Sequence, residues 1–279
     1  MSGLEGQAPY SLLKEVAEEL VLGIEDHASI DQFLFYKRRN EPLLSLGKLL
    51  IVDAILREER DSISYASADY YWLEQLTFSM IEGVDDDEPG RMFENVAFVT
   101  FNYDRLIEYH FANVVRRRRL NHGTASSRKI LEGLKVAHVY GPAGFLPETS
   151  DATPQINFGE QNIGIERLIA ASRIIQTFGE PESEWSKGAA AKLLADAQQV
   201  VFLGFSYGDQ NMRMLKLDPP TPARRIFAGM YKLPGTDGES IQNSIRENLC
   251  MGSAAPFIVK DVRKAGPFIR EYARTLRKG

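Results

Sequence analysis

Short apolar runs alternate with helix-like stretches over the last two thirds of the chain, and this alternation constrains the fold more than any other sequence feature. The apolar runs are residues 96–101, 135–139, 200–203, 225–228 and 257–259. The stretches with helical character are residues 103–115, 165–178, 185–198, 240–248 and 265–276. Strands separated by helices are typical of βα units and parallel sheets. The sequence therefore predicts an α/β fold with a mostly parallel sheet.

The first 90 residues have a different pattern and predict a mainly helical region. Apolar side chains recur there at helical spacing, Pro42 fits the first turn of one helix, and Ser29 begins a capping-box pattern at the start of another. Aromatic residues on a further helix are expected to pack in the core: Tyr70, Tyr71, Trp72 and Phe78. We expect a helical region over residues 1–90 and an α/β region over 91–279, joined in one compact unit.

Composition excludes several classes of protein. The net charge of −5 argues against direct binding to nucleic acid or to an anionic membrane surface. A single cysteine, Cys250, rules out an internal disulfide framework and a zinc site built from paired CxxC motifs. No apolar run reaches the roughly 20 residues that span a bilayer, and the first residues lack a signal-peptide pattern. We therefore expect a cytoplasmic protein.

Polar residues and glycines follow three of the predicted strands. Asn102 and Asp104 come after the first strand, His138 ends the second, and Gly204 and Ser206 follow the third. Ligands bind beyond the carboxyl ends of parallel strands, so these positions are candidates for a site. Each also has a structural interpretation: Asn and Asp cap helices, a lone histidine is often a core residue, and Gly-x-Ser alone is weak evidence.

Taken together, the three segments resemble the sirtuin-like domain family. The sequence reads Val-Thr-Phe-Asn-Tyr-Asp at 99–104, His-Val-Tyr-Gly at 138–141 and Phe-Leu-Gly-Phe-Ser-Tyr-Gly-Asp-Gln-Asn at 202–211. The resemblance extends over most of residues 10–215. It implies a Rossmann-like sheet with a helical insertion, and NAD as substrate or ligand. Many bacterial members act in antiphage defence by hydrolysing NAD to nicotinamide and ADP-ribose.

The resemblance also implies roles for individual residues. Asn102 would orient the attacking water or the nicotinamide ribose, with Asp104 as its partner near the nicotinamide pocket and His138 as the third catalytic residue. Gly204 and Ser206 would hold the phosphates of ADP-ribose. The implied cofactor-binding residues are Thr100, Phe101, Tyr140, Gly141, Gly204, Phe205, Ser206 and Asn211.

Two departures from the family pattern bear on activity. The four-cysteine zinc module of the deacylases is absent, so we expect no zinc-containing deacylase and no metal. The catalytic His-Gly pair of the family reads Tyr140-Gly141, with His138 two positions earlier. Tyrosine is a poor base at neutral pH, but residues two apart on a strand point the same way, which would let His138 reach the pocket.

Two functions remain open at this point. One is an NAD hydrolase, acting alone, as a homo-oligomer or with a partner protein of a defence system. The other is a catalytically inactive module that binds NAD or ADP-ribose, or serves as a scaffold.

The third departure concerns the sheet itself. The first strand of the family, with its glycine-rich phosphate loop, has no counterpart in the sequence. We expect the strands ending at Phe101, Val139 and Leu203 to be parallel neighbours in one sheet, with the missing strand supplied from upstream or by a partner. Without that strand, the sheet would have to close up and NAD affinity would be poor, because unpaired strand edges are costly when buried.

Overall fold

All five predicted strands are present in the computed structural model, within one or two residues of their expected limits. They are β1 (Ala97–Thr100), β2 (Lys135–His138), β3 (Gln199–Phe202), β4 (Arg225–Gly229) and β5 (Phe257–Asp261). Every pairing between them is parallel. The structure describes residues 7–27, 30–64, 71–85, 87–122, 127–177, 180, 184–218, 225–249 and 257–276. The predictions on Ser29, Tyr70 and Cys250 fall outside these residues.

The strands form two sheets, and the prediction of one sheet is wrong. β1 pairs with β2 in a two-stranded sheet, whereas β3, β4 and β5 form a three-stranded sheet in that order. Among the described residues no strand bridges β1 and β3, and the sheets have not closed up. Side chains join them instead: Val99 and Phe101 pack against the hydrophobic cluster that contains Val200 and Phe202. Hydrophobic contact does not require the register of a hydrogen-bonded ladder, so the two sheets share a core without shared pairing.

The chain forms two units that do not follow a boundary at residue 90. The first unit consists of Met1–Ser64, Asn102–Arg105 and Tyr140–Glu182, and the second of Tyr65–Phe101, Leu106–Val139 and Ser183–Gly279. The chain therefore passes from the second unit into the first immediately after each of β1 and β2.

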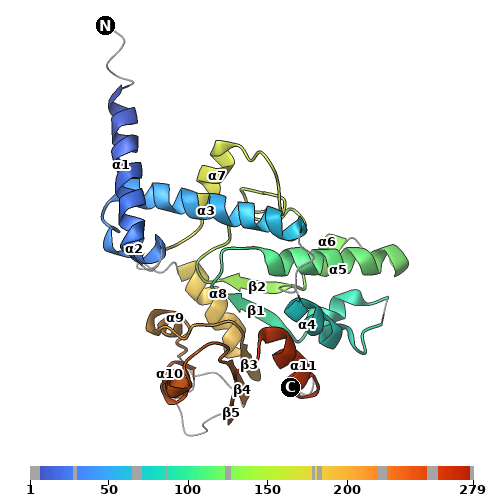
Figure 1. The fold of residues 1–279 in the computed structure, drawn as a ribbon. Coiled ribbons are helices and arrows are strands. Elements are labelled where there is room, and N and C mark those ends of the chain that lie inside the picture. The colour runs from blue at the N-terminus through green and yellow to red at the C-terminus, as the bar shows by residue number, and fades with distance from the viewer. Residues whose placement is uncertain are drawn as a thin grey trace. The chain divides into compact units, whose positions relative to one another are not determined.

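Four helices make up most of the first unit: α1 (Gln7–Glu25), α2 (Ile30–Tyr36), α3 (Glu41–Ser64) and α7 (Ile165–Ser172). The long helix α3 contacts each of the other three (Figure 1). Their core contains Phe33, Leu34, Val52 and Ile156, all almost completely buried.

In the second unit, helices α4 (Tyr71–Ile81), α5 (Leu106–His122), α6 (Ser127–Leu131), α8 (Glu184–Ala195), α9 (Asp209–Met214), α10 (Gly238–Leu249) and α11 (Ala265–Leu276) surround the strands (Figure 1). The 3-10 helices η2 (Pro89–Phe93) and η3 (Gly235–Asp237) complete it. Trp72 packs against two of its core clusters, as predicted. The same prediction is wrong for Phe78, whose side chain is 61% exposed.

None of the described helices is both long and apolar enough to cross a membrane. The described residues also contain no cluster of histidine, cysteine, aspartate and glutamate that would hold a metal ion.

Candidate functional site

The candidate residues divide between the two units. Asn102, Asp104, Tyr140 and Gly141 belong to the first unit. The other candidates belong to the second: Thr100, Phe101, His138, Gly204, Phe205, Ser206 and Asn211. Each group is therefore described within its own unit.

In the second unit, β1 and β2 bring Thr100 and His138 to the same level. The two residues are direct partners in the parallel register, and the amide of Val139 continues the ladder by donating to the Thr100 carbonyl at 2.8 Å. Both strands end at this edge. The next residues along the chain are the polar segment that begins at Asn102 and the turn that contains Tyr140.

His138 is buried and hydrogen-bonded to a carboxylate that the sequence analysis missed. Its Nε2 atom lies 2.7 Å from Oε1 of Glu108, and the two side chains are 5% and 13% exposed. Glu108 lies in the first turn of α5, the helix that follows β1. Its position four residues after Asp104 was the only signal in the sequence, and a carboxylate in a first helical turn is ordinarily explained by the helix dipole.

This pairing defines the hydrogen-bonding state of the imidazole. An ionised carboxylate only accepts hydrogen bonds, so with Glu108 ionised the hydrogen is on Nε2 of His138. Nδ1 of the neutral ring is then the atom that can take a proton, the arrangement used when a carboxylate orients a histidine base. The second oxygen of Glu108, Oε2, is buried and has no hydrogen-bond partner among the described residues.

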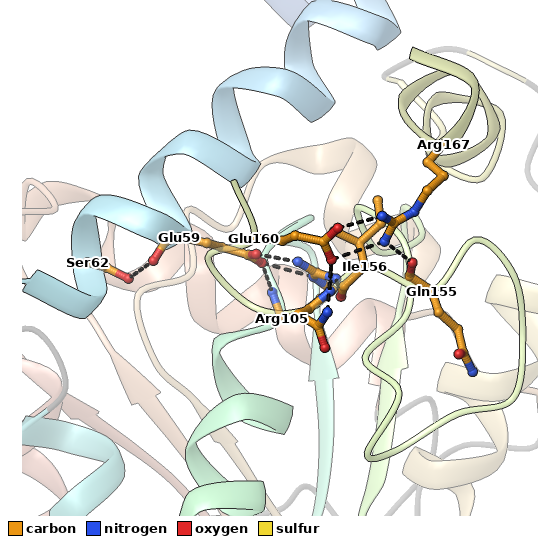
Figure 2. A network of polar contacts seen from close by, with 8 residues as sticks. Glu59, Ser62, Arg105, Gln155, Ile156, Glu160 and Arg167 are labelled. Carbon is orange, nitrogen blue, oxygen red and sulfur yellow. Dashed lines mark hydrogen bonds and ion pairs between the residues drawn. The ribbon is translucent and has the colours of Figure 1, made fainter. Parts of the chain in front are cut away.

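In the first unit, Tyr103 and Arg105 bind the segment Asn102–Arg105 to neighbouring elements. The Tyr103 hydroxyl donates to the Gln176 carbonyl at 2.8 Å and lies 3.2 Å from Oδ1 of Asp31 on α2. Arg105 is 1% exposed and pairs with Glu59 on α3 (Figure 2). The Tyr103 carbonyl also accepts from the amide of Ala143 at 2.8 Å.

The Tyr103 hydroxyl faces two hydrogen-bond acceptors, the Gln176 carbonyl and the Asp31 carboxylate. Tyrosine has one hydroxyl hydrogen, and the Gln176 carbonyl can only accept it. Asp31 then contacts the Tyr103 oxygen favourably when its own carboxyl group carries a proton. Burial raises the pKa of Asp31, against the lowering effect of the hydrogen bond with Tyr103. Burial raises the pKa of Tyr103, which therefore stays protonated.

Tyr140 and Gly141 lie in a turn beyond β2, which ends at His138. Strand alternation therefore does not extend to Tyr140, and it does not require the side chains of Tyr140 and His138 to point the same way. The Tyr140 carbonyl accepts from the amide of Gln176 at 2.8 Å. Gly141 has φ of +78°, and a Cβ atom there would lie 2.6 Å from the Ile174 carbonyl oxygen, so packing alone requires glycine.

The loop after β3 has a buried side and an exposed side. Tyr207, at φ of +56°, is buried and donates its hydroxyl to the Gly229 carbonyl at 3.2 Å. The Phe205 ring contacts Phe101, with 5.1 Å between ring centroids. Gly204 and Ser206 are exposed, and a Cβ atom at Gly204 would meet nothing within 4 Å. The loop therefore presents open backbone and a hydroxyl on its exposed side. Asn211 follows on α9.

A cavity of about 290 Å³ opens between α3 and the segment before α7 in the first unit. Its lining residues include Asp53, Arg57, Arg60, Glu160 and Asn162. None of the candidate residues lines it.

Comparison with known families supports the resemblance seen in the sequence. Residues 96–216 match the family model described as SIR2-like domain. This range includes β1, β2, β3 and every candidate site residue, whereas α1, α2 and α3 lie outside it. Comparisons with curated proteins and with solved structures each give no match. SIR2-like domains are NAD-related, and the short parallel sheets with their helices are consistent with the Rossmann-like fold of this family. Residues 96–216 of the chain are thus similar to SIR2-like domains.

Proposed function

We propose that the protein hydrolyses NAD to nicotinamide and ADP-ribose. The bond between the nicotinamide nitrogen and the ribose carbon breaks, and its electron pair stays on the nitrogen. The oxygen of a water molecule bonds to the ribose carbon, and one proton of that water passes to a base. Following the bacterial members that the chain resembles, we assign this activity to antiphage defence in the cytoplasm, where it would deplete NAD in an infected cell.

The observation that carries the proposal is the hydrogen bond of 2.7 Å between His138 and Glu108. A buried histidine oriented by a carboxylate at the carboxyl end of a parallel strand has the properties of a general base. We assign the proton of the attacking water to His138. A structural histidine would need a partner too, but a neutral serine, threonine or carbonyl oxygen would satisfy it without burying a carboxylate.

Asn102 and Asp104 receive the positioning roles. An amide side chain both donates and accepts, so Asn102 suits the task of holding a water molecule or a ribose hydroxyl. Asp104 is assigned to the nicotinamide end of the substrate. Exposed Gly204 and Ser206 are assigned to the phosphates, since their loop offers backbone amides and a hydroxyl.

One observation favours a second function, a module that binds NAD or ADP-ribose without cleaving it. Tyr140 occupies the position of the family's catalytic histidine, and His138 is only 5% exposed. A base with so little exposed surface can act only on a substrate that is in direct contact with its imidazole ring. In this alternative the Glu108–His138 pair stabilises the fold and the loop at Gly204 retains the ligand.

Nicotinamide release by the purified protein tests the two functions directly. The hydrolase predicts steady release from NAD that is at least about a hundredfold slower in Asn102→Ala, with unchanged thermal unfolding. Release should fall as much in His138→Ala, which is assayed below its lowered unfolding temperature because Glu108 loses its partner. Tyr140→Phe should have a smaller effect. Calorimetric NAD binding without nicotinamide release would establish the binding module instead. Full activity in both Asn102→Ala and His138→Ala would refute the assigned roles.

A further inference from the structure

Burial increases along this segment, from exposed Asn102 through half-buried Tyr103 and Asp104 to buried Arg105. Asn102 and Asp104 are the two candidates for substrate contact. Tyr103 and Arg105 both form hydrogen bonds to the rest of the first unit. Arg105 has the more extensive set of contacts, and all of them lie in the interior.

Glu59 on α3 is the principal partner of Arg105 (Figure 2). Oε1 of Glu59 accepts from the backbone amide of Arg105 at 2.9 Å and from its Nε at 3.0 Å. Oε2 accepts from Nη2, and Nη1 donates to the carbonyl of Ile156 at 2.6 Å. The Arg105 and Glu59 side chains are 1% and 2% exposed.

The bond to the backbone amide separates this pair from an ordinary salt bridge. Burying two charges gains little stability, because the cost of removing them from water offsets their attraction. Such a pair does restrict geometry, since a fork of fixed shape meets a planar carboxylate in few orientations. Here the same carboxylate also holds the main chain immediately after Asp104, so that Glu59 limits where the preceding residues can lie.

We propose that Glu59 is a positioning residue, which fixes the Asn102–Asp104 segment through Arg105. This inference rests on the proposed function, because it is NAD hydrolysis for which the segment would be positioned. Glu59 itself touches no reactant. A displacement of about 1 Å at a reacting group can cost on the order of a hundredfold in rate, so the loss of this anchor should lower kcat more than it raises KM.

A second ion pair on the same loop provides a matched control (Figure 2). Arg167 on α7 pairs with Glu160 and donates to the carbonyl of Gln155, one residue before the carbonyl that Arg105 binds. This pair ties the loop to α7, and in the described part of the chain its hydrogen bonds go to Gln155 and Asn157 and not to Asn102–Arg105. The variant Glu160→Gln therefore weakens the loop without removing the anchor.

The experiment compares the wild type, Glu59→Gln, the double variant Glu59→Leu with Arg105→Met, and Glu160→Gln. The double variant removes both charges together, which avoids leaving a buried arginine unpaired and preserves folding. Steady-state nicotinamide release gives kcat and KM, thermal unfolding verifies the fold, and amide hydrogen exchange reports the protection of the Arg105 amide. We expect the double variant to lose at least about tenfold in kcat with KM changed less than about threefold, and to lose protection at Arg105.

The outcomes separate this inference from the proposed function. Unchanged kcat in the folded double variant would overturn the positioning role, as would an equal loss in Glu160→Gln. If the wild type releases no nicotinamide, the proposed function fails, and hydrogen exchange decides the inference alone. Protection at Arg105 that is lost in the double variant and retained in Glu160→Gln then supports the anchor, and protection retained in both refutes it.

Discussion

The imidazole of His138 lies 2.7 Å from the carboxylate of Glu108. This contact joins the end of β2 to the first turn of α5, the helix that follows the neighbouring strand β1. The relationship is a consequence of parallel topology. β1 and β2 end at the same edge, and α5 begins six residues after β1 ends, so its first turn lies beside the end of β2. A residue at the end of one strand thus meets a residue that is 30 positions away in the sequence.

The first prediction concerns Glu108→Gln. The glutamine amide retains the size of the carboxylate, but its NH₂ group can donate to Nε2 and place the imidazole hydrogen on Nδ1 instead. The base is then in the wrong tautomer, and kcat for nicotinamide release should fall by at least about tenfold with little change in KM. Glu108→Asp, which keeps the charge, should retain more activity than Glu108→Gln.

Thr77→Val is the matched control for this prediction. The Thr77 hydroxyl lies 2.7 Å from Nε2 of His110, a half-buried histidine of α5. The variant therefore removes a comparable bond that has no role in the proposed reaction. A loss of kcat as large as that in Glu108→Gln would mean that any disturbance of α5 impairs turnover, and would refute a specific role for Glu108.

The sequence predicted the elements of the sheet well because each strand is an apolar run with a clear start and end. Residues 265–276 were predicted as a helix and are α11 (Ala265–Leu276) in the structure. The division into two sheets was not predictable from these runs. Apolar composition shows that β1 and β3 are buried, but hydrogen-bond partners between strands depend on what lies beside each edge.

The site was less predictable than the fold. Glu108 and Glu59 look like ordinary helix-surface glutamates in the sequence, and only the tertiary structure places them against His138 and Arg105. Arg105 directly follows the recognised motif, yet a single arginine there is usually solvent-exposed. Phe78 shows the opposite error, since an aromatic residue at helical spacing was expected in the core and is exposed.

The second prediction is that Asp31→Asn stabilises the protein at neutral pH. Because burial raises the pKa of Asp31, the folded state holds its proton more tightly than the unfolded state does. Stability from this group is therefore present at low pH and is lost as pH rises through the raised pKa. Asparagine donates to the Tyr103 oxygen at every pH. Urea unfolding should show a gain at pH 7 that disappears near pH 4. A destabilised variant at pH 7 would contradict the proton assignment.

The third prediction is that His110 makes the protein less stable in mild acid. Burial, aided by the charge of Arg117, lowers the pKa of His110 to about 4. Between that value and the ordinary histidine pKa of about 6.5, the unfolded chain binds a proton that the folded protein does not, so the free energy of unfolding falls as pH falls. The difference in unfolding free energy between wild type and His110→Gln should shift by about 1 kcal/mol against the wild type from pH 7 to pH 4.5. A difference independent of pH would contradict it.

The fourth prediction separates structure from function at Gly141. The φ of +78° alone makes alanine unfavourable there, and the added Cβ atom would also lie 2.6 Å from the Ile174 carbonyl oxygen, which belongs to the backbone and cannot rotate away. Gly204, at φ of +61° with open space around it, provides the control for backbone conformation alone. We expect Gly204→Ala to cost about 1 kcal/mol of unfolding free energy, and Gly141→Ala roughly 1–3 kcal/mol more, measured by chemical denaturation. For NAD binding per folded molecule the order should be reversed. Gly204→Ala should weaken binding more than Gly141→Ala does, because Gly204 belongs to the loop assigned to the phosphates. Equal destabilisation in both would show that the backbone near Ile174 yields to the extra atom, and would remove the packing explanation for Gly141.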